Sequence, residues 1–156
     1  MERLFSSQPR PEIKIFIYSV GTSDRSFDEF LSLLLEHEIE AGVDVRSFPV
    51  SRFPHFVKEA LQRALESSGI QYDYLGKELG GFRKGGYPVY METESFRRGL
   101  QRLEEIGKEK RVAFFCSERF PWRCHRRYIA QQLSQRGWEV IHLIERGSVW
   151  IPKRKD

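Results

Sequence analysis

The residues best suited to chemistry lie close together in the second half of the chain. Cys116 and Cys124 are its only cysteines, and a glutamate, a histidine and four arginines lie between or just after them, among them Glu118, His125 and Arg126. A cysteine becomes a nucleophile when its thiol ionises, which nearby arginines and helix N-termini favour. Histidine takes up and releases protons near neutral pH, and glutamate can serve as an acid–base or orienting group. We therefore expect a reactive site in which both cysteines, Glu118 and His125 are catalytic and Arg126 binds an anion.

The two thiols have different expected surroundings. Cys116 ends the apolar run 112–116, and cysteine is among the most buried residue types, so core packing is the alternative to a reactive role. Cys124 stands where a helix is expected to begin, so we predict that it has the lower pKa and reacts faster. A tyrosine-phosphatase loop has arginine six positions after its cysteine; here Trp122 takes that position and Arg123 follows it, so the pattern is not met.

A metal site is another interpretation of the same residues. Cys116, Cys124 and His125 could supply three ligands, and Glu118 or Asp44 a fourth. The spacing is not that of a zinc finger or ribbon, and adjacent residues on a helix point about 100° apart. We therefore assign no residue to a metal and leave the cofactor open.

The surrounding pattern alternates strands with helices. Apolar, β-branched and aromatic runs predict strands at 13–20, 41–45, 70–75, 112–116 and 140–144. Helical spacing of apolar residues predicts helices at 26–37, 57–67, 93–108 and 124–135. Ser26 and Glu29 have the capping-box spacing that starts the first of them. The alternation predicts an α/β fold: a single domain with a five-stranded, mainly parallel sheet and helices on both faces, Rossmann-like.

In such a sheet, ligands bind where the C-terminal ends of the strands meet. Polar and glycine residues follow four of the predicted strands, and we expect them to converge on one pocket. Asp44 and Arg46 lie two residues apart, and form either an ion pair that fixes a loop or an acid–base carboxylate beside an anion-binding guanidinium. Asp44 therefore joins the catalytic candidates, and the expected ligand-binding residues are Ser23, Arg25, Arg46, Arg52, Gly80, Gly81 and Arg126.

The composition limits the class of protein. A chain of 156 residues fits one domain, with residues 1–12 and 147–156 expected as peripheral tails. No apolar run has the length of a membrane span, and the first residues lack the apolar core of a signal peptide, so we expect a cytoplasmic protein without a membrane partner. In that compartment free thiols, metal ligands or a redox pair are expected rather than a structural disulfide. The net charge of +4 fits an anionic ligand.

Motifs along the chain resemble those of a known family. They lie at 17–23 with Arg25 and Phe30, 43–46 with 49–52, 69–72, 79–81, 90–91, 116–118 with 124–127, and Gly137 with 140–142. In this order they resemble the bacterial and archaeal domain of unknown function 488 family. The resemblance implies a small α/β domain with the motif residues in one pocket, and it brings no established reaction. Thr22 stands where the family commonly has histidine, and Val57 where asparagine is common, so a role for that histidine does not carry over.

Three functions are open from the sequence. The leading one is a cytoplasmic, enzyme-like domain that binds a small anionic or nucleotide-like ligand and performs thiol-dependent or acid–base chemistry. The second is a nucleic-acid-binding or processing domain, because the long loops combine basic residues with aromatic ones that could stack on bases: Phe53, Phe56, Phe82, Tyr87 and Tyr90. The third is a metal-binding or redox-sensing module. The sequence does not specify an oligomeric state.

Overall fold

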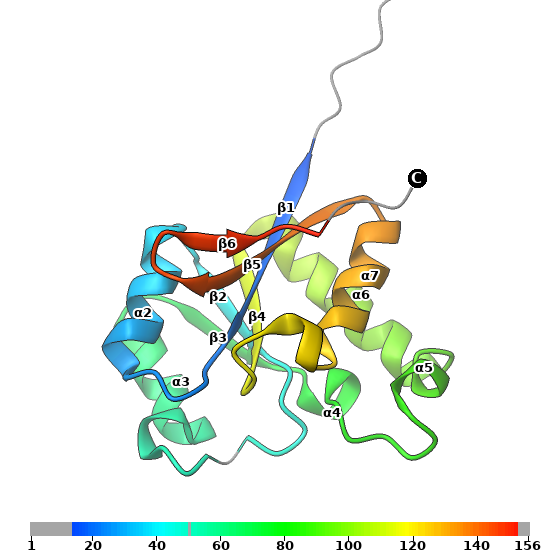
Figure 1. The fold of residues 1–156 in the computed structure, drawn as a ribbon, viewed down its shortest axis with the longest axis horizontal. Coiled ribbons are helices and arrows are strands. Elements are labelled where there is room, and N and C mark those ends of the chain that lie inside the picture. Colours follow the sequence, from blue (N-terminus) through cyan, green and yellow to red (C-terminus); the bar gives the residue numbers. More distant parts are fainter. Residues whose placement is uncertain (1–13, 50, 153–156) are drawn as a thin grey trace, which may run out of the picture.

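The structure, a computed structural model, describes residues 14–49 and 51–152. Its centre is one six-stranded sheet in the order β3-β2-β4-β1-β5-β6 (Figure 1). The strands are β1 (Ile15–Gly21), β2 (Ala41–Asp44), β3 (Gln71–Tyr74), β4 (Val112–Cys116), β5 (Trp138–Glu145) and β6 (Ser148–Trp150). Only the pairing of β5 with β6 is antiparallel among the pairings of this sheet. The α/β fold and the mainly parallel sheet expected from the sequence are confirmed.

The sheet differs from the expected one in two ways. It has six strands rather than five, because Ser148–Trp150, expected in a tail, pairs with β5 after a turn in which Gly147 has a φ of 75°. Its order also differs from the Rossmann order 3-2-1-4-5-6, because β4 lies between β2 and β1. "Rossmann-like" is therefore only an approximate description. The expected N-terminal tail, 1–12, and the last residues, 153–156, lie outside the described residues.

Helices cover both faces of the sheet. On one face, α2 (Phe27–Glu36) and α3 (Lys58–Ser67) pack over one apolar core, and the predicted capping box starts α2. On the other face, α6 (Glu94–Glu109) and α7 (Arg126–Gln135) cover a second core. Short helical turns occupy the connections: η1 (Pro54–Phe56), α4 (Gly76–Leu79), α5 (Tyr87–Tyr90) and η2 (Pro121–Arg123). No helix within the described ranges is both long and apolar enough to cross a bilayer.

At the C-terminal end of β4, the connections that follow neighbouring strands run to opposite faces of the sheet. The chain leaves β1 and β2 toward the face of α2 and α3, but it leaves β4 toward the face of α6 and α7. Strands whose connections diverge in this way leave a crevice at their C-terminal ends, where ligands usually bind. In the register of the sheet, Gly21 of β1 lies opposite Cys116 of β4. The topology therefore places the cysteine segment beside this crevice.

Gly21 lets two of these loops approach closely. A Cβ atom at this position would lie 1.9 Å from the carbonyl oxygen of Glu118, so only glycine fits beneath the loop that follows β4. The loops are also joined through their backbones, because the Thr22 N–H donates to the Cys116 carbonyl at 2.8 Å. The segment after β1 therefore fixes the backbone on which Cys116 sits.

Candidate functional site

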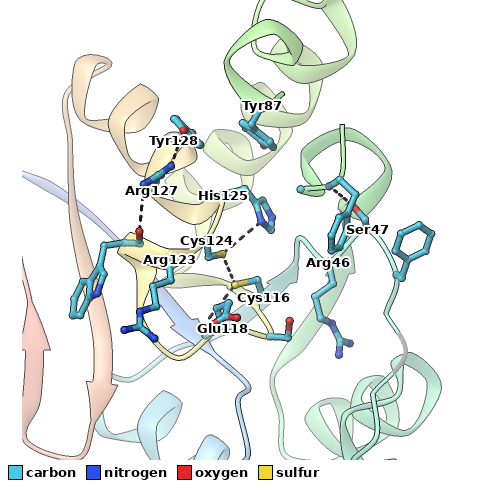
Figure 2. Close-up of a pocket in the computed structure, with 15 residues that line it drawn as sticks. Arg46, Ser47, Tyr87, Cys116, Glu118, Arg123, Cys124, His125, Arg127 and Tyr128 are labelled. Atoms are coloured by element: carbon cyan, nitrogen blue, oxygen red, sulfur yellow. Dashed lines mark hydrogen bonds between the residues drawn. The ribbon is translucent and has the colours of Figure 1, made fainter. Parts of the chain in front are cut away.

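Cys116 and Cys124 lie side by side at the C-terminal end of β4 (Figure 2). Both are free thiols, and their Sγ atoms are 2.7 Å apart. Cys116 is buried at the end of the strand, whereas Cys124 is half-buried in the connection that leads to α7. The two sulfurs are in direct contact and either can donate a hydrogen bond to the other, so the site is an interacting dithiol rather than two separate cysteines.

The guanidinium of Arg126 is fully buried against this dithiol. Its Nε donates to Cys116 Sγ at 3.0 Å, its Nη1 donates to Ser19 Oγ at 2.9 Å, and its Nη2 donates to the carbonyl of Glu118. None of the ion pairs formed by the described residues gives Arg126 a carboxylate partner. Because a buried charge without a counter-charge is costly, the Cys116 thiolate is the anion that the site provides for it.

The contacts favour ionisation of Cys116 over Cys124. Burial raises the pKa of the Cys116 thiol, but the hydrogen bond from Cys124 and the positive charge of Arg126 together lower that pKa to about 6. The pKa of Cys124 is raised, because it donates its proton to Cys116 and is itself buried. This order is the reverse of the sequence expectation. The helix begins at Arg126, after Cys124, and the long arginine side chain reaches back to the end of β4.

His125 lies beside the dithiol with a free lone pair. Its Nε2 is 2.9 Å from the carbonyl oxygen of Val45, which can only accept, so Nε2 carries the proton and Nδ1 does not. Nδ1 lies 3.5 Å from Cys124 Sγ. Burial lowers the pKa of His125 to about 4, so the ring is neutral at pH 7. A Cβ at Gly81 would lie 2.8 Å from Nδ1, so this glycine allows the loop to pack on the ring.

A second pair of polar residues supports Arg126 from inside the sheet. Ser19 Oγ accepts a hydrogen bond from Arg126 and therefore donates its own proton to His142 Nδ1. Burial and the nearby Arg126 charge lower the pKa of His142 to about 3, so this ring is neutral. Trp150 of β6 stacks on the ring, with centroids 5.4 Å apart. Sequence reasoning missed this support; its only signal was a polar residue within each of two apolar strands.

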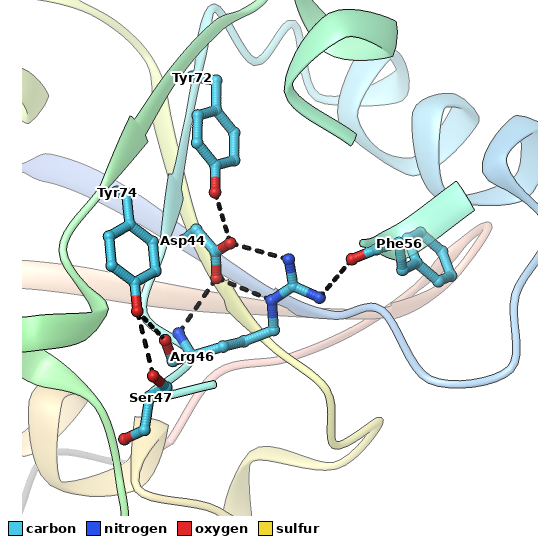
Figure 3. A network of polar contacts seen from close by, with 6 residues as sticks. All are labelled: Asp44, Arg46, Ser47, Phe56, Tyr72 and Tyr74. Atoms are coloured by element: carbon cyan, nitrogen blue, oxygen red, sulfur yellow. Dashed lines mark hydrogen bonds and ion pairs between the residues drawn. The ribbon is translucent and has the colours of Figure 1, made fainter. Parts of the chain in front are cut away.

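Asp44 and Arg46 form a closed structural network (Figure 3). Arg46 donates to both carboxylate oxygens of Asp44 at 2.8 Å and to the Phe56 carbonyl at 2.6 Å. The Tyr72 hydroxyl donates to the same carboxylate at 2.6 Å. Asp44 is completely buried, and Arg46 is 4% exposed. Of the two alternatives for this pair, the contacts match the ion pair that fixes a loop, although Arg46 also borders the pocket described below.

The structure does not bring every expected ligand residue to the dithiol. Arg25 is buried and donates to two backbone carbonyls. Arg52 is exposed and stacks on an aromatic ring, and Ser23 donates to the side chain of the next residue. Gly80 allows the close approach of Ser47, whose Oγ would lie 2.2 Å from a Cβ there. Of the seven expected ligand residues, only Arg46, Gly81 and, through its contact with Cys116, Arg126 belong to the site.

A pocket of about 470 Å³ opens over the two thiols. It is lined from the loops after β2, β3 and β4 and from the start of α7. Its walls are rich in aromatic rings: Phe48, Phe82, Tyr87, Trp122 and Tyr128. Its charged lining includes the exposed side chains of Glu118, Arg123 and Arg127. Arg123 takes part in none of the ion pairs found among the described residues, which leaves its guanidinium available to a ligand.

The suggested metal ligands do not form a metal-binding group in the part of the chain that the structure describes. Within residues 14–49 and 51–152, no group of three or more histidine, cysteine, aspartate or glutamate side chains is arranged to hold a metal ion. Asp44, one of the suggested fourth ligands, is engaged by Arg46 and Tyr72 instead.

Comparison with known proteins identifies the family. No curated protein and no solved structure matches the chain. The family model described as "Domain of unknown function DUF488" matches residues 26–133, from the N-cap of α2 into α7. The matched segment includes both cysteines and the buried arginine of the site. The resemblance seen in the sequence motifs is confirmed, and the chain belongs to the family of the domain of unknown function DUF488.

Proposed function

We propose that this protein is a thiol-dependent enzyme in which the Cys116 thiolate attacks a small anionic substrate. The observation that carries the proposal is the buried Arg126 guanidinium, which donates to Cys116 Sγ at 3.0 Å and has no carboxylate partner among the described residues. The thiolate is the nucleophilic form of cysteine, and a thiol whose pKa lies near ambient pH combines a high thiolate fraction with good nucleophilicity. The Cys116 pKa of about 6 satisfies this requirement.

The neighbouring residues have separate roles in this proposal. Arg126 stabilises the Cys116 thiolate, and Cys124 donates a proton to it in the resting site. The unprotonated Nδ1 of His125 lies 3.5 Å from Cys124 Sγ and can accept a hydrogen bond from its thiol. The exposed carboxylate of Glu118 borders the pocket and exchanges protons with the substrate.

The pocket supports a flat, anionic ligand of metabolite size. Its volume of about 470 Å³ lies in the range of small-molecule sites. The aromatic walls offer faces on which a planar group can stack. Arg123 offers a planar fork for a carboxylate or phosphate, and it takes the role that the sequence assigned to Arg46 and Arg52. We place this chemistry in the cytoplasm, where the reducing environment keeps a free dithiol intact.

Alkylation of the purified protein tests the proposal. Iodoacetate and iodoacetamide deliver the same small electrophile with and without a negative charge, and peptide mass spectrometry assigns the modified cysteine. We expect Cys116 to be the first residue labelled, with a rate that rises through about pH 6. We also expect the ratio of the iodoacetate rate to the iodoacetamide rate to be higher for Cys116 than for a free thiol in solution. Arg123→Ala should remove this preference.

A matched control separates a local effect of Arg123 from an effect of net charge. Arg98→Ala removes one positive charge from the exposed surface of α6, outside the pocket lining, and is expected to leave the reagent preference unchanged. If Cys116 is labelled only at the pH at which a free thiol ionises, it is a packing residue and the proposal fails.

A further inference from the structure

The second thiol of the site has a geometry that simple nucleophilic attack does not require. Cys124 Sγ lies 2.7 Å from Cys116 Sγ, whereas a disulfide bond is about 2.05 Å long, so a movement of less than about 1 Å would join them. We propose that the pair reduces small anionic disulfides, with Cys116 as the attacking thiolate and Cys124 as the resolving thiol. This inference rests on the proposed function, because both use the Cys116 thiolate.

The first step opens the substrate disulfide, R–S–S–R. The Cys116 thiolate attacks one substrate sulfur, a bond forms between that sulfur and Cys116 Sγ, and the substrate S–S bond breaks. The leaving thiolate, R–S⁻, takes the electron pair and is protonated by water. Arg123 holds an anionic group of the substrate, and Arg126 keeps its position against Cys116 Sγ. The product of this step is a mixed disulfide on Cys116.

Formation of the mixed disulfide prepares Cys124 for the second step. In the resting site Cys124 keeps its proton because its neighbour Cys116 is anionic. Once Cys116 is bonded, that anion is gone, while the positive charge of Arg126 and the hydrogen bond from its backbone N–H to Cys124 Sγ, 3.3 Å, remain. Cys124 therefore ionises more readily and releases its proton to water in the pocket that it lines, while Nδ1 of His125 lies 3.5 Å from its sulfur.

The second step closes the protein disulfide. The Cys124 thiolate attacks Cys116 Sγ, the Cys116–Cys124 bond forms, and the second R–S⁻ leaves with the electron pair of the broken bond. Overall, two electrons pass from the protein dithiol to the substrate, which becomes two R–SH. An external dithiol returns the protein to its reduced form by the reverse exchange and is itself oxidised to a disulfide.

The shape of the pocket favours a disulfide over a smaller oxidant. A cavity of about 470 Å³ with aromatic walls is much larger than a peroxide requires, and it accommodates a substrate with side groups on its sulfur. The guanidinium of Arg123, which forms no ion pair with any of residues 14–49 and 51–152, favours a substrate that carries carboxylates. Oxidised glutathione has both properties, and hydroxyethyl disulfide is its neutral counterpart.

The experiment treats the reduced full-length protein with each of these disulfides and follows its intact mass. We expect the wild type to lose the mass of two hydrogen atoms, with a Cys116–Cys124 crosslink in the peptide map. Cys124→Ser is expected to stop at a mixed disulfide on Cys116, and Cys116→Ser to remain unmodified over the same time. Oxidised glutathione should react at least about tenfold faster than hydroxyethyl disulfide, and Arg123→Ala should remove this preference.

The outcomes distinguish the inference from the proposed function. If the wild type accumulates the same mixed disulfide as Cys124→Ser, or never forms the crosslink while Cys116 still alkylates near pH 6, Cys124 does not resolve and the inference is overturned alone. If Cys116 also fails to alkylate, both proposals fail. Circular dichroism checks the fold of each variant, and Cys124→Ala replaces Cys124→Ser if the serine variant does not fold.

Discussion

Replacement of Arg126 by methionine is the most direct perturbation of the site, because methionine keeps much of the side-chain length and removes the charge. The pKa of Cys116 is lowered from the ordinary 9.0 to about 6, which corresponds to about 4 kcal/mol in favour of the thiolate. Burial opposes this stabilisation and persists in the variant. The hydrogen bond from Cys124 also persists, so we expect the pKa of Cys116 in Arg126→Met to rise from about 6 toward the ordinary value by the share that Arg126 contributes.

The change in pKa translates into a large change in reactivity at pH 7. A thiol with a pKa of about 6 is about 90% ionised at this pH, whereas one with a pKa of about 9 is about 1% ionised. The rate of iodoacetamide labelling of Cys116, read from its peptide across pH 4 to 10, should therefore fall at pH 7, by at most about 100-fold. Arg123→Ala is the matched control, since it removes a pocket arginine that does not contact Cys116 Sγ. A Cys116 pKa that stays near 6 in Arg126→Met would refute the reasoning.

Three further perturbations test the surroundings of the thiols. The folded-state pKa of His125 is about 4 against an ordinary 6.5, so the unfolded chain binds the proton first as the pH falls, and the free energy of unfolding decreases from pH 6.5 toward pH 4. In urea unfolding, His125→Gln should reduce this decrease by up to about 3 kcal/mol. An equal decrease in both proteins would contradict the assignment. Ser19→Ala removes an acceptor from the buried guanidinium and should raise the Cys116 pKa while the fold persists; an unchanged pH–rate profile would show that Ser19 does not position it. Asp44→Asn breaks the buried pair with Arg46 and should cost about 3–5 kcal/mol in urea unfolding, whereas a cost below about 1 kcal/mol would mean that the pair is not structural.

The fold was largely predictable because its signals are local. The parallel strands are short segments rich in apolar, β-branched or aromatic residues, and the capping box at Ser26 and Glu29 marks the start of α2 as expected. The strand β6 was not predictable in this way. The segment Ser148–Trp150 has only three residues, all of them exposed, and it forms a strand only by pairing with the edge of β5.

The location of the site was more predictable than its chemistry. Parallel strands bring their C-terminal ends to one edge, so the cysteine segment and the loop around Gly81 were expected together. The ionised thiol could not be identified from spacing, because it depends on where the long side chain of Arg126 ends. For the same reason Arg46 was expected to bind a ligand, although its guanidinium is occupied by Asp44, two residues away in the chain.

The buried Arg126 also bears on the energetics of an oxidised pair. A bond between Cys116 and Cys124 would leave this guanidinium in the interior without any anion, whereas the reduced state supplies one. An ordinary structural disulfide stabilises a fold, mainly by restricting the unfolded chain. Here the crosslink spans only a short loop and removes a favourable charge pair, so reduction should raise the melting temperature. Such a fold favours the dithiol, so an external dithiol would readily return the oxidised pair to its reduced, anion-bearing state.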